Sequence, residues 1–352
     1  MSVLASRVPN VQPRAMEGIG CIVLGMLLFA AQDGMMKSLL GVYPIWMLIA
    51  VRGVLAIAIL GPIDLILRGP HRVFSPLWPL HLLRAVLFAV GFSCFYAAFP
   101  FMGLAEVSTI FFSAPLIIAL LASVWLGERI GRYRVSALIA GFIGVLIAMN
   151  PTSDAFHWVA LLPLICAATY AVSQIVARQI GDRETTLTTG LYTIVFSSVL
   201  MGIAGWVVNQ SYALGPEFNH LRWEWPAPST HEALMLALLG SVGMTGYMLL
   251  SRAYQVTSAS IVAPFDYSYL PFAIVIAYIF WEETPSDSTI LGMALIVSSG
   301  LYIGYRELRS ARRQVEPPFV AEAVITPGSP LEPMSLGTEL QNAHETDRQI
   351  IH

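Results

Sequence analysis

Ionisable side chains inside long apolar stretches are the first feature of this sequence that points to chemistry. Asp33 and Lys37 lie four residues apart in one apolar run, and Arg52 lies in the next run. Asp266 lies well inside a much later run. A charged group at the centre of a bilayer costs about 2.5–3.5 kcal/mol on insertion scales, so such groups turn inward and are paired or hydrated. These residues are therefore the first candidates for contact with a polar solute.

Asp33 and Lys37 allow two interpretations. Residues four apart share one face of a helix, so the two could neutralise each other and fix their helix against Arg52. Alternatively they hold a substrate, with Arg52 neutralising Asp33 and Lys37 left for an anionic group. The sequence does not choose between these pairings, and we assign Arg52 itself a structural role.

The surroundings of Asp266 favour a binding role over packing. Pro264 and Pro271 interrupt the helix on either side of it, and Tyr267 and Tyr269 add aromatic faces. Carriers commonly build their sites where a helix is unwound near the middle of the membrane. We expect Asp266, Tyr267 and Tyr269 to contact substrate, with Asp266 also a candidate for a coupling proton.

Aromatic and polar side chains on other segments complete the expected set of substrate contacts. Phe112 lies before Pro115, in the first-half counterpart of the Asp266 stretch, and Tyr96 lies on the preceding segment. Tyr170 and Gln174 stand four apart and put polar groups on one side of a helix. Isolated aromatic residues more often pack than recognise, so these four rank below the charged residues.

Two acids end apolar segments. A carboxylate at the end of a helix is disfavoured by the helix dipole, so Glu128 and Glu283 could instead cap the helix that follows each of them. We interpret both as structural charges.

Enzyme chemistry has no support in the sequence. It contains no HExxH, GxSxG or GxxxxGK[ST] motif, and its three cysteines and seven histidines lack metal-ligand spacing. We therefore expect no catalytic residues, no metal and no cofactor.

Ten apolar segments must position the candidate residues. With 56% hydrophobic and 12% charged residues, the chain is too apolar for a soluble protein, in which about 25% of residues are charged. Most segments approach the ~20 residues that a membrane helix needs, which predicts an all-α integral membrane protein. The segments lie near residues 18–40, 45–66, 82–103, 107–127, 135–150, 156–177, 187–208, 232–251, 258–281 and 288–305.

The second half of the chain repeats the first at a spacing of 155 positions. Gly91 aligns with Gly246, and Glu128 aligns with Glu283. Because five helices separate the copies, the second must enter the membrane upside down, which predicts two inverted five-helix repeats over residues 18–150 and 156–305. Inverted repeats of membrane helices are the signature of a secondary transporter.

Positive charges predict the orientation. Lys and Arg gather in alternate loops, whereas the opposite loops contain only Arg222. The positive-inside rule therefore places both termini in the cytoplasm and the 209–231 loop on the outer side. We expect the membrane to be the inner (plasma) membrane. Residues 1–17 form a cytoplasmic N-terminus, and residues 306–352 form a cytoplasmic tail that we expect to be disordered.

Three stretches carry a family resemblance. The run 105–128, followed by a helix with Gly141 and Gly144, resembles the EamA module of the drug/metabolite transporter superfamily, and so does 259–283 followed by Gly292. Residues 29–37 are similar to the opening of a branch that includes S-adenosylmethionine carriers. The resemblance implies a ten-helix carrier whose central cavity is lined by helices 1, 3, 4, 6, 8 and 9.

The leading hypothesis is alternating-access transport of a small polar, zwitterionic or amphipathic metabolite, such as an amino acid or an S-adenosylmethionine-like compound. Asp33, Lys37 and Asp266 are its expected charged contacts. The alternatives are a non-transporting receptor or assembly subunit and, less favoured, an integral membrane enzyme. The expected partners are the small-molecule substrate and the lipid bilayer, without nucleic acid; a homodimer stays an open alternative.

Overall fold

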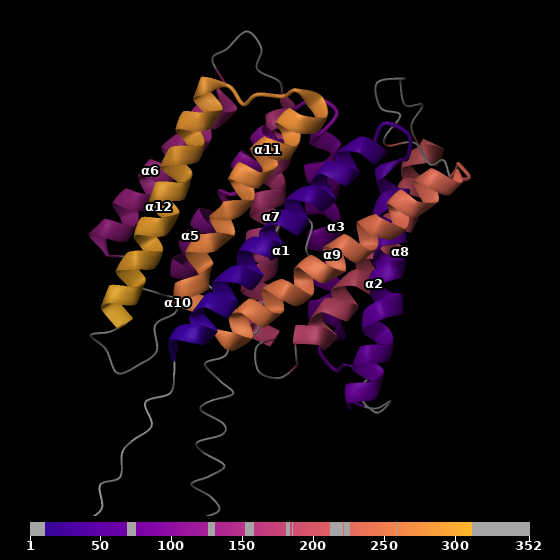
Figure 1. Ribbon diagram of the computed structural model, residues 1–352, viewed down its shortest axis with the longest axis horizontal. Helices are drawn as coiled ribbons and strands as arrows, with labels where there is room; N and C mark the ends of the chain where they lie inside the picture. The colour runs from indigo at the N-terminus through magenta and orange to yellow at the C-terminus, as the bar shows by residue number, and fades with distance from the viewer. Residues whose placement is uncertain are drawn as a thin grey trace, which may run out of the picture.

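The computed structural model consists of helices packed side by side (Figure 1). It describes residues 11–68, 75–125, 131–151, 158–180, 184, 186–211, 221, 226–257 and 259–311. Nine helical spans in this described part are long and apolar enough to cross a membrane, and Ile45–Ile59 is a shorter apolar span. The expected all-α membrane fold is confirmed.

The helices follow the predicted segments closely. They are α1 (Val11–Leu39), α2 (Ile45–Arg68), α3 (Trp78–Ala98), α4 (Leu104–Phe111), α5 (Ala114–Trp125), α6 (Arg132–Met149), α7 (Leu161–Ile180), α8 (Thr186–Ser211), α9 (Thr230–Val256), α10 (Ala259–Val262), α11 (Tyr269–Trp281) and α12 (Asp287–Ala311). Two 3-10 turns, η2 (Trp158–Ala160) and η5 (Ala263–Ser268), precede α7 and α11.

Several helix ends differ from the predicted boundaries. α1 begins at Val11, before residue 18, and α12 continues past residue 305 to Ala311. Hydropathy marks where the apolar part ends, whereas a helix can continue into water with solvated polar residues. Glu128, most of the 209–231 loop and the tail from residue 312 lie outside the described residues.

Proline interrupts one helix in each repeat. α4 and α5 are separated at Phe112 and Ser113, just before Pro115. Proline lacks an N–H group and its ring clashes with the carbonyl four residues earlier, which favours a break in the helix just before it. In the second repeat, the 3-10 segment η5 contains Pro264 and leads into α11. The two broken helices bring irregular backbone into the interior of the bundle.

Helix packing follows a two-fold arrangement. α1 packs against α9 and α11, and α7 packs against α3 and α5, which is the same pair of contacts with the repeats exchanged. α2 packs on α8, and α6 packs on α12, so each of these pairs joins equivalent helices of the two repeats. The described ends of the chain, the start of α1 and the end of α12, lie on one side of the bundle in Figure 1.

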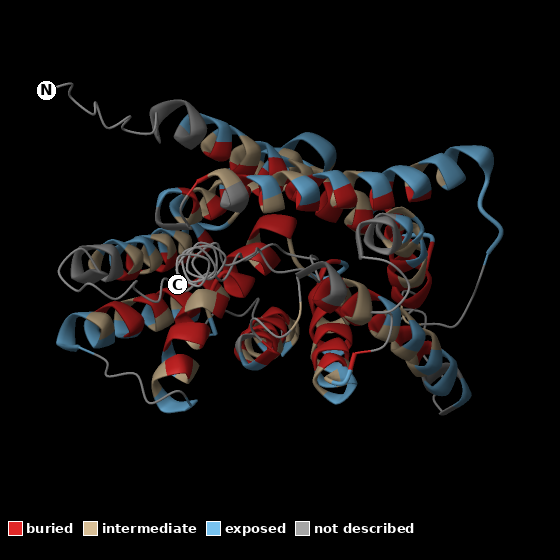
Figure 2. Cartoon of the chain, turned by 90° about the horizontal axis from the view of Figure 1, so that it is seen from below, coloured by how far each residue is buried: buried red, intermediate tan, exposed pale blue. Residues whose placement is uncertain are grey.

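Exposed apolar residues cover the outside of the bundle. Figure 2 shows buried positions on the inward sides of the helices and exposed positions on the outward sides. On α6, Ile139, Ile143 and Leu146 lie along one side of the helix and are 57%, 48% and 58% exposed. An apolar surface of this kind needs lipid around it.

α6 and α12 meet at two glycines. A methyl group added at Gly292 would lie 2.5 Å from the backbone oxygen of Gly144 and 2.6 Å from Cβ of Ala148. Small residues allow membrane helices to approach this closely, since association there depends on packing rather than on the hydrophobic effect.

We expect Gly292→Ala to destabilise the protein by about 1–3 kcal/mol through overpacking. Gly304→Ala, on the same helix, is the matched control because a methyl group there meets no atom within 4 Å. Thermal unfolding in detergent should give a lower Tm for Gly292→Ala and an unchanged or slightly higher Tm for Gly304→Ala. Equal Tm values for the two variants would contradict the close packing of α6 on α12.

Candidate substrate site

A buried hydrogen-bond network occupies the interior of the bundle around Asp33. The Asp33 side chain is fully buried, and its two carboxylate oxygens accept hydrogen bonds from Tyr96 Oη at 3.1 Å and Tyr269 Oη at 2.7 Å. Arg52 donates from Nη1 to Tyr96 Oη at 2.9 Å, and Ser108 Oγ lies 3.3 Å from Tyr269 Oη. Residues from α1, α2, α3, α4 and α11 thus meet around one carboxylate.

Tyr96 connects the two charges of this network. It accepts from Arg52 and donates to Asp33, and the Arg52 guanidinium carbon also lies 6.0 Å from the centre of its ring. A buried carboxylate is costly unless it is hydrogen-bonded and neutralised, and this arrangement does both. Arg52 therefore compensates Asp33 through Tyr96, as one of the two sequence interpretations required.

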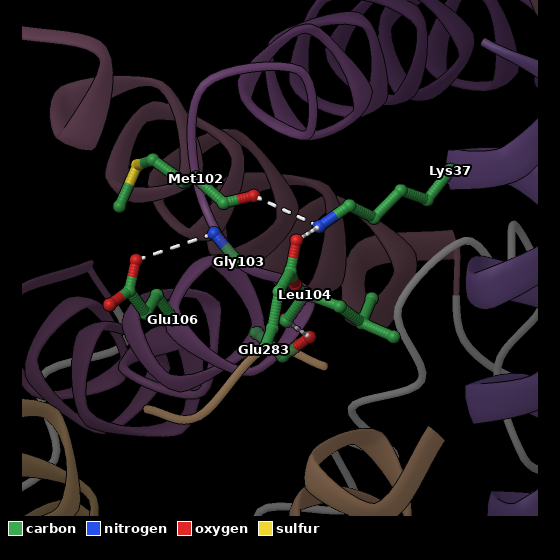
Figure 3. Close-up of polar contacts among 7 residues, drawn as sticks. Lys37, Met102, Gly103, Leu104, Glu106 and Glu283 are labelled. Carbon is green, nitrogen blue, oxygen red and sulfur yellow. Dashed lines mark hydrogen bonds and ion pairs between the residues drawn. The ribbon is translucent and has the colours of Figure 1, made fainter. Parts of the chain in front are cut away.

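Lys37 is held elsewhere. Its ammonium group forms an ion pair with Glu283 and donates to the Met102 carbonyl at 3.4 Å (Figure 3). It also lies 5.2 Å from the Trp281 ring centre. Glu283 also accepts a hydrogen bond from the backbone nitrogen of Leu104 at 3.2 Å. We call Lys37, Glu283 and the Leu104 amide the clasp, since it ties α1 and α4 to the segment that follows α11.

The geometry of the clasp bears on two hypotheses about Asp33 and Lys37. Asp33 and Lys37 do not neutralise each other, because their side chains have different partners from different helices. Lys37 is also not left uncompensated, since Glu283 neutralises it. The structural role expected for Glu283 agrees with this geometry, although Glu283 caps the earlier helix α4, where the positive end of the dipole favours a carboxylate.

A cavity of ≈ 490 Å³ lies beside the clasp. Its lining includes one ammonium group, two carboxylates and several aromatic rings, contributed by Lys37, Phe99, Phe101, Glu106, Trp281 and Glu283. Asp33 precedes Lys37 by one helical turn, so it lies about 6 Å deeper along α1. The Asp33 network therefore lies below a polar and aromatic cavity of metabolite size.

Aromatic contacts tie the broken helices together. The ring of Phe112, at the break between α4 and α5, lies 5.7 Å from the ring of Tyr267 and 5.5 Å from that of Tyr269. Asp266 is buried on the same 3-10 segment as Tyr267. The predicted residues Phe112, Tyr267 and Tyr269 thus meet where the two proline-interrupted helices face each other, and Asp266 lies directly before Tyr267.

Tyr170 and Gln174 belong to a second aromatic group. Gln174 donates from Nε2 to Tyr170 Oη at 2.5 Å. The Tyr170 ring lies 5.6 Å from that of Phe111 and 6.5 Å from that of Phe92, which in turn lies 6.2 Å from the Tyr96 ring. Tyr170 is therefore linked to the Asp33 network through a series of aromatic rings.

Polar groups also join the repeats at the opposite end of the bundle. Nε2 of His81, at the start of α3, lies 2.9 Å from Glu184 Oε2, and Ser75 Oγ donates to the other oxygen of Glu184. The imidazole stacks on Tyr192 of α8, with ring centres 4.8 Å apart. This His81 cluster binds the first repeat to the second on the side of the bundle where α3 begins.

Sequence reasoning missed several residues of the site. Ser108, Glu106 and Trp281 lie in otherwise apolar or helix-terminal positions, where a single polar or aromatic residue carries little signal. Gln32 directly precedes Asp33 inside a predicted helix, so it offered the same signal as the charged candidates, and a search for every polar residue inside the apolar segments could have found it. His81 lies one residue before the segment predicted at 82–103, so that search would have missed it.

Family comparison agrees with this architecture. The model of the EamA-like transporter family matches residues 16–150 and 157–305, one match for each half of the helix bundle. The chain belongs to the EamA-like transporter family. It is accordingly a membrane transporter of the drug/metabolite transporter superfamily and not an enzyme.

Curated relatives are transporters for different solutes. The chain is 29% identical over 233 residues to a riboflavin transporter of Rhizobium johnstonii, covering 66% of this chain and 72% of the relative. It is 25% identical over 237 residues to an S-adenosylmethionine uptake transporter of Rickettsia conorii, with 67% and 75% covered. It is 30% identical over 222 residues to the pseudopaline exporter CntI of Pseudomonas aeruginosa, with 62% and 72% covered.

Solved structures share the fold. One crystal structure superposes with a TM-score of 0.55 at 18% sequence identity, covering 85% of this chain and 99% of its own. At that identity the likeness concerns the arrangement of helices alone.

Proposed function

We propose that this EamA-family protein is a secondary carrier that moves a small zwitterionic or amphipathic metabolite with an aromatic or heterocyclic part by alternating access. The observation that carries the proposal is the ≈ 490 Å³ cavity, which has charges of both signs beside aromatic rings and lies above the buried Asp33 network. Mixed charges suit a zwitterion, and rings such as Trp281 and Phe99 suit a planar group. Relatives named for riboflavin and S-adenosylmethionine agree with a solute of this class.

Polar contacts between the repeats at both ends of the bundle support alternating access. The clasp joins the repeats beside the cavity, and the His81 cluster joins them at the opposite end. Opening one end by rocking the repeats requires the contacts at that end to separate. We propose that the clasp and the His81 cluster separate in different steps of the cycle.

The expected site residues take separate roles in this proposal. Lys37 offers its ammonium group to an anionic part of the solute, in exchange for Glu283. Tyr96, Tyr170, Gln174 and Phe112 shape the interior surface, while Asp266 contacts the solute or a coupling proton at the broken helix.

The role of Asp266 can be tested with a matched pair of variants. A thermal-shift screen of riboflavin, S-adenosylmethionine and amino acids on purified protein identifies the solute, and its uptake is then measured in proteoliposomes. Asp266→Asn keeps the size and much of the hydrogen-bonding capacity but removes the charge, so we expect uptake to fall at least tenfold with the protein still folded. Asp287→Asn, at an exposed position on α12, should retain wild-type uptake. Wild-type affinity and uptake in Asp266→Asn would remove Asp266 from the site.

The orientation is part of the same proposal: both termini lie in the cytoplasm, and the cavity opens to the outside of an inner membrane. We expect a cysteine at Ala227, which is exposed before α9, to react with a membrane-impermeant maleimide on intact cells. A cysteine at the exposed Gly131, before α6, should react only after lysis. Both variants are made after replacing Cys21, Cys94 and Cys166. The reverse pattern of labelling would place the cavity on the cytoplasmic side.

A further inference from the structure

A small second cavity lies next to the Asp33 network, between α1, α2, α8 and α9. Its volume is ≈ 40 Å³, and its lining includes Gln32, Arg52, Ser197, Ser198 and Tyr247. Because a water molecule needs roughly 10–15 Å³ measured in this way, the cavity has room for a few waters, a chloride ion or one carboxylate group. It is too small for a whole metabolite.

Two side chains that can donate hydrogen bonds, Arg52 and Gln32, belong to the lining of this cavity. Among the described residues, Tyr96 is the one hydrogen-bond acceptor for Arg52, whose guanidinium carries five N–H groups. Gln32 is 1% exposed, and its Nε2 has no hydrogen-bond partner in the described part of the chain. No carboxylate belongs to the described lining. A buried guanidinium and a buried amide N–H group suit a small anion, above all a carboxylate.

The hydrogens of the network can be counted at Tyr269. Ser108 donates its hydroxyl hydrogen to the Leu104 carbonyl at 2.7 Å, and Tyr269 donates its own to Asp33 at 2.7 Å. With Asp33 ionised, no hydrogen then remains for the 3.3 Å contact between the Ser108 and Tyr269 oxygens. With a proton on Asp33, the carboxylic acid donates to Tyr269, Tyr269 donates to Ser108, and Ser108 donates to Leu104. The network can therefore accept one proton at Asp33, and this proton completes a continuous chain of hydrogen bonds from Asp33 to the Leu104 carbonyl.

Protonation of Asp33 changes what Arg52 requires. The ionised carboxylate compensates the guanidinium through Tyr96, whereas the protonated form leaves a buried positive charge without compensation. An anion in the small cavity would restore neutrality. Within the described part of the chain, Arg52 is the cation joined to this network, because Lys37 on α1 is engaged by Glu283. The network also contains Tyr96 from α3, Ser108 from α4 and Tyr269 from α11, and the elements packed on α1 carry Tyr247 on α9 and Asp266 and Tyr267 on η5.

We propose that Asp33 and Arg52 form a coupled site that takes up one proton and one small anion together, the proton on Asp33 and the anion between Arg52 and Gln32. This deepens the proposed function, on which it rests for the identity of the solute. The anion is the carboxylate end of a transported zwitterion, which Lys37 meets first in the large cavity and Arg52 holds afterwards. The proton on Asp33 is the coupling ion, and Asp266 then contacts the solute. Binding of the anion favours the neutral form of Asp33, and protonation of Asp33 favours binding of the anion.

The experiment measures binding of sodium formate to the purified full-length protein at pH 8 by calorimetry, in two buffers with different enthalpies of ionisation. Formate supplies a carboxylate small enough for the cavity, and sodium isethionate at equal ionic strength is the reference salt. We expect formate binding with uptake of about one proton per formate, since one carboxylate, Asp33, is coupled to the site. No solute flux is needed, so the result is independent of the carrier assay.

Variants assign the two partners. Asp33→Asn should still bind formate but without proton uptake, because its side chain is already neutral. Gln32→Met removes the N–H donor at similar size and should weaken formate binding about tenfold, as expected for a hydrogen bond to a charged group. Arg252→Gln removes an exposed cation from a remote ion pair and should change neither quantity.

A parallel measurement of chloride binding tests whether the bound anion is a carboxylate. Weaker binding of chloride than of formate supports a carboxylate site, whereas equal or tighter binding of chloride overturns the assignment to the carboxylate end of the solute. The coupled site is contradicted if wild-type protein binds neither anion more strongly than isethionate. It is also contradicted if formate binds without proton uptake, or if Asp33→Asn takes up the same proton.

Discussion

Arg52→Gln is expected to lower the free energy of unfolding by about 3–5 kcal/mol at pH 8, as removal of one partner from a buried charge pair does. The variant leaves the Asp33 carboxylate inside the bundle with tyrosine hydroxyls as its hydrogen-bond partners but without a cation. Most of the protein should then aggregate during extraction in detergent. Size-exclusion chromatography and thermal unfolding of the monodisperse fraction measure the loss.

The double variant Arg52→Gln, Asp33→Asn should recover more than half of that stability. It removes both charges together, so neither is left buried alone. Arg252→Gln, which breaks an exposed pair with Glu17, serves as control and should leave the Tm unchanged. Additive losses in the double variant would show that Arg52 does not compensate Asp33 through Tyr96.

The second large effect is expected from variants of the clasp, which should alter the stability of the protein. Lys37→Met and Glu283→Gln should show a coupling free energy of about 0.5–3 kcal/mol in a double-mutant cycle of thermal unfolding, since residues in direct contact within one network couple by that amount. The side chains of this pair are 9% and 32% exposed, so solvent screens their interaction only in part. The clasp also joins the two repeats, and the single variants should change the rate of solute uptake as well as the Tm.

The pair between Arg252 and Glu17 is the matched control for this cycle. Its oxygen and nitrogen atoms are 2.8 Å apart, but its side chains are 54% and 44% exposed. An exposed ion pair is worth about 0.2–1 kcal/mol, so its coupling should stay at the low end of that range. If the two cycles gave the same small value, Lys37 and Glu283 would not hold the repeats together.

Sequence periodicity and hydropathy were sufficient to predict the positions of the helices. Apolar segments of membrane length and the repeat at 155 positions predicted where each transmembrane helix lies, and proline at positions 115 and 271 marked the helices that are broken. These signals are local or depend on comparing the chain with itself. They do not report how far a helix continues into water, and the ends of α1 and α12 differed for that reason.

The partners of the charged residues could not be read from the sequence. Lys37 lies one turn from Asp33, which suggested a local pair, yet its partner Glu283 is 246 positions away in the other repeat. The same limit applies to Tyr96 and Tyr269, which reach Asp33 from α3 and α11. Helical spacing gives the face of each residue, but the packing of distant helices decides which faces meet.

Counterflow in liposomes that contain only this protein tests the carrier proposal most directly. The metabolite with the largest thermal shift is loaded unlabelled inside, and entry of the labelled compound is followed over time. The account predicts a transient accumulation of label above its equilibrium level, and a strong decrease of that accumulation in Asp266→Asn. Binding of the metabolite with no entry above that of protein-free liposomes would contradict transport and favour a receptor.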